Sequence, residues 1–267
     1  MKRRSFISRS LGVAAAATAG LSSTLVPQAS AQAAPGRDYY ELRVYRLKAG
    51  AQTAPLEAYL EKAAIPALNR MGIKPVGVFT EIEPKEAPAV FVLLPSTDLG
   101  LLASAWLRLS TDPAYRAAAA SYLETPKGSP AFERIDSWLL LAFSGMQRLE
   151  QPDYSKNGKP RLFELRTYES YSEAKGQKKV DMFNSGEIEV MHEIGLGPIF
   201  FGQALTGPNM PHLTYMTSGE NAEEHKKHWD AFGKHPVWDK LKNDPQYADT
   251  VSKMLKWMLK PTAYSQI

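Results

Sequence analysis

The sequence predicts an α+β protein built from two tandem ferredoxin-like repeats, each with the order β-α-β-β-α-β, packed as a pseudo-dimeric α/β barrel. Three observations support this fold class. The pattern Glu-Leu-Arg-x-Tyr occurs at residues 41–45 and again at 164–168, 123 residues further on. Strand-like and helix-like segments follow each copy in the same order. The polar stretch 150–161, which contains proline and glycine, separates the two series and is typical of a linker.

Other residue types coincide at the same offset. Without a gap, residues 40–115 match the second copy at nine positions, where composition alone would give roughly four or five. The matches include rare or structurally demanding types, such as Trp106 with Trp229. We therefore interpret residues 38–149 and 162–267 as duplicated units, of which the first has diverged.

Each unit opens with a strand and a long helix. The segments YELRVY and FELRTY alternate apolar and polar side chains, which is the period of a half-buried strand. Helical stretches follow at residues 54–71 and 172–194. Gly72 and Gly195 come next, where a C-cap glycine ends a helix.

The rest of each unit supplies three more strands and further helices. Turns with glycine or proline separate the strands, and a proline near the start of each second strand is compatible with a sheet. We predict these strands at residues 74–80, 89–95 and 137–145 in the first unit and at 197–204, 212–218 and 252–259 in the second. We predict helices before the fourth strands at residues 99–110, 112–118, 222–232 and 235–241.

Two such units in one chain predict a barrel. In a ferredoxin-like unit the helices cover one face of the sheet and leave the other face bare. A bare apolar face must be buried against another element. Tandem copies can bury their bare faces against each other, which gives a pseudo-symmetric barrel.

The first 33 residues have the pattern of an export signal. A basic start, MKRRSFISRS, precedes the mildly apolar stretch 11–26, and small residues offer cleavage sites after Ala31 or Ala33. The Arg-Arg-x-Phe-Ile segment that begins at Arg3 resembles a twin-arginine (Tat) signal, and an ordinary secretory signal is the alternative. We therefore expect a periplasmic protein.

Charge and composition exclude several classes of function. The chain carries 32 basic and 28 acidic residues, and four of the basic residues lie in the signal, so the rest carries 28 of each. This balance excludes a basic nucleic-acid-binding surface. The absence of cysteine excludes disulfides, thiol catalysis and cysteine-ligated metals. No apolar run after the signal is long enough to span a bilayer.

The second unit resembles a NIPSNAP domain. The resemblance lies in the segments FELRTYES, GEIEVMHEIGLGPIFFGQ, HWDAFGKHPVWDKLK and KPTAYSQI. It covers residues 162–267 strongly and 39–149 weakly, because the first unit has DPAY for HPVW and Ala64 for Glu187. The resemblance implies the dimeric α/β-barrel superfamily, and a first unit that keeps the fold without the site. It implies no defined activity.

A charged stripe on the first strand of each unit is a candidate site. Residues two apart on a strand share a face, so Glu164, Arg166 and Tyr168 form one stripe and the residues between them form the other. We expect the apolar stripe to face the helices and the charged stripe to face the barrel interior. The matching stripe of the first unit would meet it at the seam between the units, and consists of Glu41, Arg43 and Tyr45.

Two interpretations of the charged stripe stay open, with an exposed stripe as a third. In the first, the charges form ion pairs that join the two units. In the second, Arg166 anchors an anionic or polar ligand, because its guanidinium presents a planar fork to carboxylates.

All five histidines lie in the second unit. His225 and His228 are three apart on a helix rich in lysine and glutamate, which favours a solvated surface, and we predict no metal site. The His-Trp pairs of this region favour packing on the sheet, with a cavity for a flat or hydrophobic ligand as the alternative. The candidate ligand-binding residues are Glu164, Arg166, Tyr168, Gln203, Tyr215, His228, Trp229, His235 and Trp238.

These observations favour a binding or interaction protein that holds a small polar, anionic or hydrophobic ligand, or a protein partner, at the pseudo-barrel. The alternative is an enzyme, because the superfamily that the second unit resembles includes cofactor-free monooxygenases and haem-handling oxidoreductases. A module whose barrel is filled by its own side chains is the third option. The sequence indicates no catalytic residue and no cofactor, and a homo-oligomer is left open.

Overall fold

The computed structural model describes residues 36–84, 87–151, 157 and 159–267. The predicted export signal lies outside these residues, and the predicted linker 150–161 lies partly outside them. Both duplicated units belong to one compact body.

The first unit has the element order that the sequence predicts. Its strands are β1 (Tyr39–Arg46), β2 (Gly77–Glu81), β3 (Ala89–Ser96) and β4 (Arg134–Ala142). The long helix after β1 consists of α1 (Ala54–Tyr59), a π-helical turn (Leu60–Ala64) and α2 (Ile65–Arg70). The helices after β3 are α3 (Leu99–Leu109), α4 (Pro113–Ala118) and α5 (Ala120–Leu123).

The second unit repeats this order. Its strands are β5 (Leu162–Glu169), β6 (Pro198–Thr206), β7 (His212–Gly219) and β8 (Lys253–Pro261). The long helix after β5 consists of α7 (Glu173–Met182), a π-helical turn (Phe183–Glu187) and α8 (Ile188–Glu193). After β7 come α9 (Ala222–Lys234), α10 (Pro236–Lys242) and a short 3-10 turn (Pro245–Tyr247).

Local sequence explains where these helices begin and end. The side chains of Ser172 and Asn221 accept hydrogen bonds from backbone N–H groups three residues further on, and so cap α7 and α9. Gly72 and Gly195 follow the two long helices with φ of +87° and +77°, a left-handed conformation that glycine adopts without strain. The predicted C-cap glycines are confirmed.

The duplication extends to an irregular feature. Both long helices are interrupted at places 123 residues apart, the offset of the sequence matches: by a π-helical turn at Leu60–Ala64, and at Phe183–Glu187 by a turn in which Ser185 and Gly186 leave helical geometry. Interruptions of this kind are rare in helices. Two of them at one offset are more simply explained by duplication than by independent origin.

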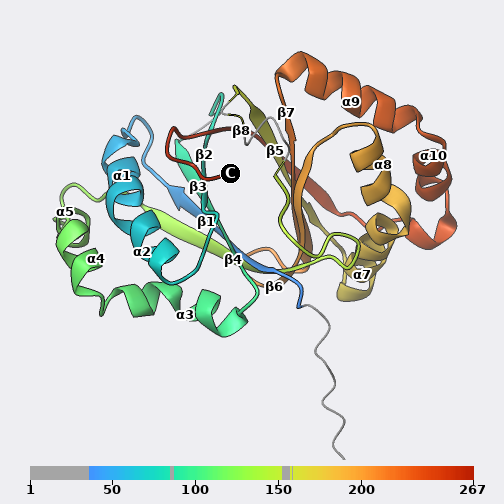
Figure 1. Cartoon of the computed structure of the whole chain (residues 1–267). Coiled ribbons are helices and arrows are strands. Elements are labelled where there is room, and N and C mark those ends of the chain that lie inside the picture. The colour runs from blue at the N-terminus through green and yellow to red at the C-terminus, as the bar shows by residue number, and fades with distance from the viewer. Residues whose placement is uncertain (1–35, 85–86, 152–156, 158) are drawn as a thin grey trace, which may run out of the picture. The chain divides into compact units, whose positions relative to one another are not determined.

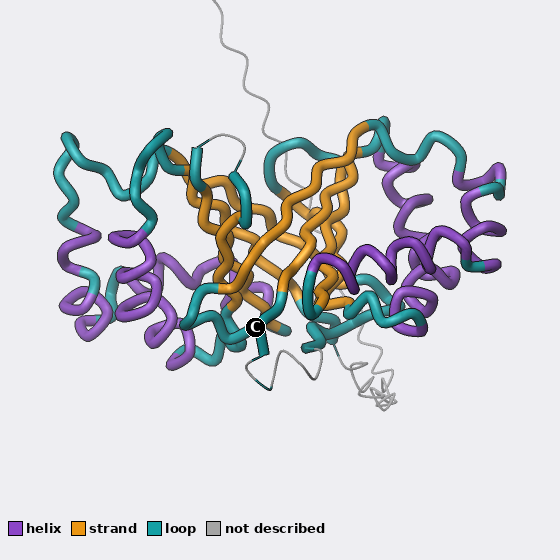
Figure 2. The backbone as a smooth tube through the Cα atoms, turned by 90° about the horizontal axis from the view of Figure 1, so that it is seen from above, coloured by secondary structure: helices purple, strands orange, loops and turns teal. Residues whose placement is uncertain are grey.

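The eight strands close into one antiparallel barrel. The order around it is β1-β3-β2-β8-β5-β7-β6-β4, so each unit contributes four neighbouring strands. The units join through edge strands, β2 with β8 and β4 with β6. The helices of the first unit lie on one side of the strands and those of the second unit on the opposite side (Figure 1 and Figure 2). The predicted pseudo-dimeric α/β barrel is confirmed.

Apolar side chains from both units fill most of the barrel interior. Phe163 and Leu165 of β5 belong to this cluster, together with Leu42 of β1 and Phe79 of β2. The rings of Phe79 and Phe163 meet across the β2–β8 seam with centroids 4.8 Å apart. The interior cluster is therefore continuous between the units.

The expected orientation of the first strands is wrong. Their apolar stripe faces the barrel interior, and the stripes that begin at Glu41 and Glu164 face the helices instead of the seam. The reason is that the part of the lumen behind these carboxylates is apolar and offers them no partners, whereas tryptophans on α3 and α9 present N–H donors to them. The charged stripes consequently join strands to helices within each unit and do not join the two units.

Candidate functional site

In the first unit, a carboxylate on the sheet accepts a tryptophan N–H from the covering helix. Trp106 Nε1 on α3 donates to Glu41 Oε2 at 2.8 Å, and the Ser137 hydroxyl of β4 donates to Glu41 Oε1 at 2.8 Å. Arg43 Nε lies 3.1 Å from Glu41 Oε1, and the guanidinium carbon lies 4.0 Å from the centroid of the Trp106 ring. We call this arrangement of Glu41, Arg43 and Trp106 the first Glu-Arg-Trp cage.

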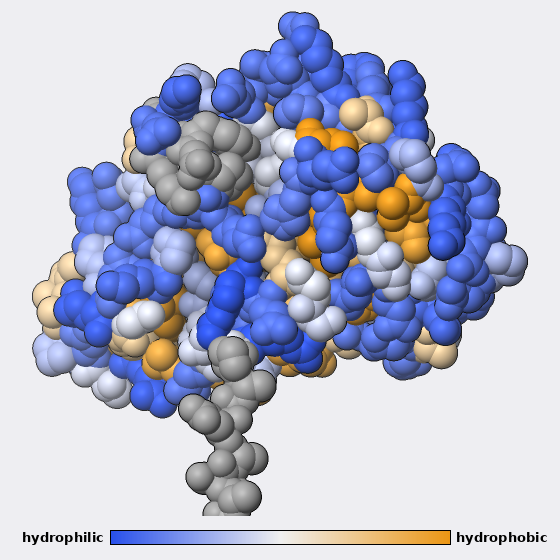
Figure 3. All heavy atoms as spheres, turned by 45° about the vertical axis from the view of Figure 1, so that its right-hand side comes forward, coloured by the Kyte–Doolittle hydropathy of each residue, from blue (hydrophilic) through white to orange (hydrophobic). Residues whose placement is uncertain are grey.

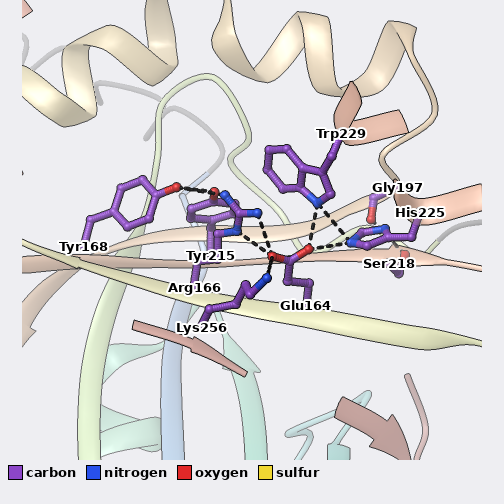
Figure 4. A network of polar contacts seen from close by, with 9 residues as sticks. All are labelled: Glu164, Arg166, Tyr168, Gly197, Tyr215, Ser218, His225, Trp229 and Lys256. Atoms are coloured by element: carbon purple, nitrogen blue, oxygen red, sulfur yellow. Dashed lines mark hydrogen bonds and ion pairs between the residues drawn. The ribbon is translucent and has the colours of Figure 1, made fainter. Parts of the chain in front are cut away.

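The second unit builds the same cage from the matching residues. Trp229 Nε1 on α9 donates to Glu164 Oε2 at 2.7 Å, and Arg166 Nη2 lies 2.7 Å from Glu164 Oε1 (Figure 4). The guanidinium carbon of Arg166 lies 3.7 Å from the centroid of the Trp229 ring, within range of a cation–π interaction. The duplicated tryptophan therefore has a structural cause, because it completes this second Glu-Arg-Trp cage as Trp106 completes the first.

The second cage has more partners than the first, where Arg43 lies over the ring of Tyr45 but no histidine or lysine joins the carboxylate. His225 Nε2 lies 2.7 Å from Glu164 Oε2, and Lys256 Nζ lies 3.9 Å from Glu164 Oε1. At the other end, Arg166 Nη1 donates to the Tyr168 hydroxyl at 3.3 Å, and that hydroxyl shares a hydrogen bond of 2.8 Å with Tyr215. Figure 4 shows these side chains as one connected network.

The network fixes the charge states of its members. Burial by itself raises the pKa of Glu164, but the hydrogen bond from His225 and the charge of Arg166 outweigh it and hold the pKa at about 2. Burial acts to lower the pKa of Arg166, yet Tyr215, Tyr168 and Glu164 together raise it. Burial raises the pKa of both Tyr168 and Tyr215. At neutral pH the network therefore contains a carboxylate, a guanidinium and two neutral phenols.

A buried ion pair lies within the helix layer of the second unit. Lys179 of α7 and Glu187 of the π-helical turn are joined at 3.0 Å, and both are almost completely buried. Burial raises the pKa of Glu187, and Lys179 opposes that shift. The ammonium group of Lys179 also lies 4.6 Å from the centroid of the Phe183 ring.

The two units differ in polarity at matching positions of the helix layer. Four buried polar side chains of the second unit replace apolar ones of the first: Lys179 for Leu56, Glu187 for Ala64, Tyr215 for Val92 and His225 for Leu102. The first unit demonstrates that the same fold closes around aliphatic residues. Because buried charges seldom add stability over well-packed apolar residues, the polar set points to a role other than folding.

A pocket of 260 Å³ opens beside the second cage. Side chains from β5, β8 and the first two turns of α9 line it, namely Glu164, Arg166, Ala222, His225, Lys226, Trp229, Lys256 and Met258. Apolar residues also reach the surface in several places between polar ones on the side that Figure 3 shows. Exposed apolar area alone therefore does not single out a site, whereas the lining of this pocket combines apolar groups with three cations.

The structure brings together five of the predicted site residues. Glu164, Arg166, Tyr168, Tyr215 and Trp229 belong to one hydrogen-bonded network, and three of them line the pocket. That they bind a ligand stays a prediction.

The other predicted site residues lie elsewhere. Gln203 Nε2 donates to Gln177 at 3.2 Å, and His235 Nδ1 accepts the N–H of Val237 at the start of α10. The ring of Trp238 packs on Phe232 with centroids 4.8 Å apart.

His228 packs under the turn that follows α8. A side chain added at Gly195 would meet its imidazole at 3.4 Å. His228 is thus turned towards this turn, and it does not line the pocket of the second cage.

His225 is a residue of the candidate site that the sequence pattern misplaces. The pattern predicts a solvated position, but the side chain is only 3% exposed and bonds to Glu164. The lysine and glutamate residues around it suggest an exposed helix, although this position is buried. The offset of 123 residues would have indicated the burial, because it aligns His225 with the core residue Leu102. Lys179 could have been found by the same comparison with Leu56.

Two further classes of feature are absent from the part of the chain that the structure describes. None of its groups of histidine, aspartate and glutamate is placed to hold a metal ion. None of its helices is long and apolar enough to cross a membrane.

The fold is similar to that of two solved proteins that are named as predicted monooxygenases. The one from Fusobacterium nucleatum subsp. nucleatum is 9% identical, has a TM-score of 0.56, and is matched over 85% of this chain and 93% of its own. The one from Lactobacillus acidophilus is 11% identical, has a TM-score of 0.55, and is matched over 84% of this chain and 94% of its own. Identities this low show likeness of fold alone.

Other comparisons concern the family. An uncharacterised NIPSNAP-like domain protein from Burkholderia xenovorans is 15% identical over 39% of this chain and 88% of its own, with a TM-score of 0.35. A search of the curated proteins finds no match.

The model of the NIPSNAP family matches this sequence twice. The matched residues are 40–127 in the first unit and 163–266 in the second. They include both Glu-Arg-Trp cages and both π-helical turns. With most of its length matched, the chain belongs to the NIPSNAP family.

Proposed function

We propose that the protein is an exported binding protein whose second unit holds a small organic anion in the pocket beside the second Glu-Arg-Trp cage. The observation that carries the proposal is the charge of the lining. Arg166, Lys226 and Lys256 contribute three cations, against the carboxylate of Glu164 and that of Asp230, which pairs with Lys226 at 2.6 Å. The pocket also lies at the N-terminal end of α9, where the helix dipole favours an anion.

Arg166 is the anchor of the proposed ligand. It directs Nε and Nη2 to Glu164 and Nη1 to Tyr168, and a guanidinium has five N–H groups, so two can still donate. Glu164 and Trp229 hold the guanidinium rigid, which lowers the entropy lost when a ligand binds. Two donors in one plane suit a carboxylate.

The remaining lining indicates an organic ligand of modest size. Met258, Trp229 and Ala222 add apolar area next to the cations. The volume of 260 Å³ lies below the roughly 300–1,000 Å³ of pockets for drug-sized molecules. We therefore expect a carboxylate with a short aliphatic chain or a single ring.

A matched pair of variants tests this proposal. Arg166→Met is expected to weaken binding of small carboxylates about 10- to 100-fold, the effect of losing charged hydrogen bonds. Arg43→Met removes the equivalent guanidinium from the first cage and is expected to leave affinity unchanged. Calorimetric titration with acetate, butyrate, benzoate and naphthoate measures both. Equal affinity in the two variants, or no binding of any of these anions to the wild type, would refute the anion site.

Export is the second part of the proposal. It is supported by the basic start, the apolar stretch and the small residues before Ala33. Protein purified from the periplasmic fraction is expected to begin after Ala31 or Ala33, and its mass identifies the N-terminus. An intact N-terminus on protein found only in the cytoplasm would contradict export. Mass spectrometry of the same sample identifies any anion that co-purifies.

Oxidation of an organic substrate is the second candidate function. It is supported by the likeness of fold to two predicted monooxygenases and by the buried, pKa-shifted groups of the second unit. Haem does not fit this pocket, because the imidazole of His225 directs Nε2 to Glu164 and its Nδ1 is buried. If the protein oxidises a substrate without a cofactor, addition of an anion that binds is expected to consume dissolved oxygen. Binding of the anion with no oxygen consumption would contradict this candidate.

A further inference from the structure

One end of the barrel interior is polar. There the side chains on the inner face of β5 and β7 change from Leu165 and Met216 to Thr167 and Thr214, whose hydroxyls share a hydrogen bond of 2.8 Å. His212, the first residue of β7, lies on the same face, and its Nδ1 is 3.3 Å from the Thr214 hydroxyl. This chain of polar groups lies on the opposite face of the sheet from the anion pocket, so it is independent of the proposed function.

Two buried nitrogen atoms at this end lack a hydrogen-bond partner among the described residues. They are Nε2 of His212 and Nε1 of Trp138, in side chains that are 3% and 5% exposed. Trp138 belongs to β4 of the first unit, and its ring meets that of His212 edge to face with centroids 6.3 Å apart. A buried donor without a partner costs about 1–3 kcal/mol, so a partner is expected at this place.

The acceptor side of this site is also present. Oε1 of Glu169 is buried without a partner among the described residues. Glu169 pairs directly with His212 in the β5–β7 register, which places the two side chains next to each other on the inner face. Donors and an acceptor therefore gather at the same end of the barrel.

The matching part of the first unit has apolar side chains in place of these polar ones. At the equivalent positions the first unit has Val44 for Thr167, Phe91 for Thr214 and Ala89 for His212. The phenyl ring of Phe91 packs on Trp257 with centroids 5.9 Å apart. Replacement of that ring by a threonine, beside an imidazole, turns an apolar contact into a polar one.

The chain is built to pass closely over Trp138. Gly207 follows β6 with φ of +143°, and a Cβ at this position would lie 2.9 Å from Cδ1 of Trp138. The β4–β6 register also shifts between Leu139 and Leu140, next to Trp138. Glycine at position 207 is therefore needed for the chain to lie against the indole at the seam.

We propose that this end of the barrel is an internal binding site for a small uncharged molecule that donates and accepts hydrogen bonds, bridging Trp138 of the first unit and His212 of the second. Water is the smallest such guest, and a short alcohol or amide has the same chemistry. Burial lowers the pKa of His212 to about 4, so the imidazole is neutral at pH 7 and offers one donor and one acceptor. An imidazole, an indole N–H and the carboxyl oxygen of Glu169 together suit a guest that both donates and accepts hydrogen bonds.

The ring N–H protons of the ¹⁵N-labelled protein test the proposal with water as the probe. The indole N–H of Trp138 is expected to show cross-relaxation with water, or with protons of another bound guest. The indole N–H groups of Trp106 and Trp229 are internal controls without such a signal, because they donate to Glu41 and Glu164. If the indole N–H of Trp138 in the wild-type protein shows no cross-relaxation with water or with protons of any other guest, the proposal is overturned without any variant.

A variant that copies the first unit provides the second arm. The double replacement His212→Ala with Thr214→Phe gives the residues found at Ala89 and Phe91, and is expected to fold and to abolish the guest signal at Trp138. An unchanged signal in this folded variant would show that the guest does not sit between the two rings, and would overturn the assignment. If the variant does not fold, the wild-type measurement still decides.

Discussion

Replacement of Lys179 by leucine, the residue at the matching position of the first unit, is expected to lower the free energy of unfolding by about 3–5 kcal/mol, because it leaves the carboxyl group of Glu187 buried without its partner. Glu187→Ala is expected to cost a similar amount by stranding the ammonium group. Urea unfolding of both variants at pH 7 measures the two losses.

The double variant decides what the pair does. Lys179→Leu with Glu187→Ala reproduces Leu56 and Ala64, and it is expected to recover most of the lost stability, since apolar residues replace a buried ion pair at little cost. If the loss of unfolding free energy in the double variant equals the sum of the two single losses, this expectation is wrong. Additive losses would show that the two side chains stabilise the helix layer through contacts other than with each other.

The second large effect is expected at Glu164. Its pKa of about 2 lies below the ordinary value of 4.5, and the difference corresponds to about 3 kcal/mol of stability at neutral pH. Because the folded-state pKa is lowered, this contribution is complete above pH 4.5 and is lost as the pH falls towards 2. Glu164→Gln is therefore expected to be about 3 kcal/mol less stable than the wild type at pH 7, with a gap that narrows below pH 4.5.

Glu41→Gln is the matched control for this experiment. Glu41 occupies the same place in the first cage, but it has a serine and no histidine among its partners, and its side chain is 10% exposed against 2% for Glu164. The loss at Glu41 is expected to be smaller. A Glu164→Gln variant whose gap to the wild type does not change between pH 5 and pH 2.5 would contradict the role assigned to its carboxylate.

The duplication made the fold predictable. The alternation of apolar and polar residues alone could not predict which face of the first strands points into the barrel. The two stripes of β5 are both largely buried, so a period of two identifies two faces without telling which one meets the other unit. The choice depends on partners that are distant in the sequence, namely Trp229 for Glu164 and Phe79 for Phe163.

The candidate site was predictable in part for a similar reason. Arg166 and Trp229 each have a counterpart in the first unit, which indicates that both units need them. The structure shows that these repeated residues form the cage that supports the helix layer in each unit. The groups that distinguish the second unit are those without a repeat. Lys179 and His225 stand where the first unit has core leucines, so the differences between the copies, more than their matches, identify what is particular to the second unit.

A crystal structure of the protein with 4-iodobenzoate tests most directly whether the second unit alone carries the anion site. The iodine marks the position of the ring through its anomalous signal. We predict one bound molecule per chain, with its carboxylate at Arg166 and its ring near Met258, and no molecule at Arg43. Equal occupation of both Glu-Arg-Trp cages, or binding only at another place on the molecule, would contradict the prediction.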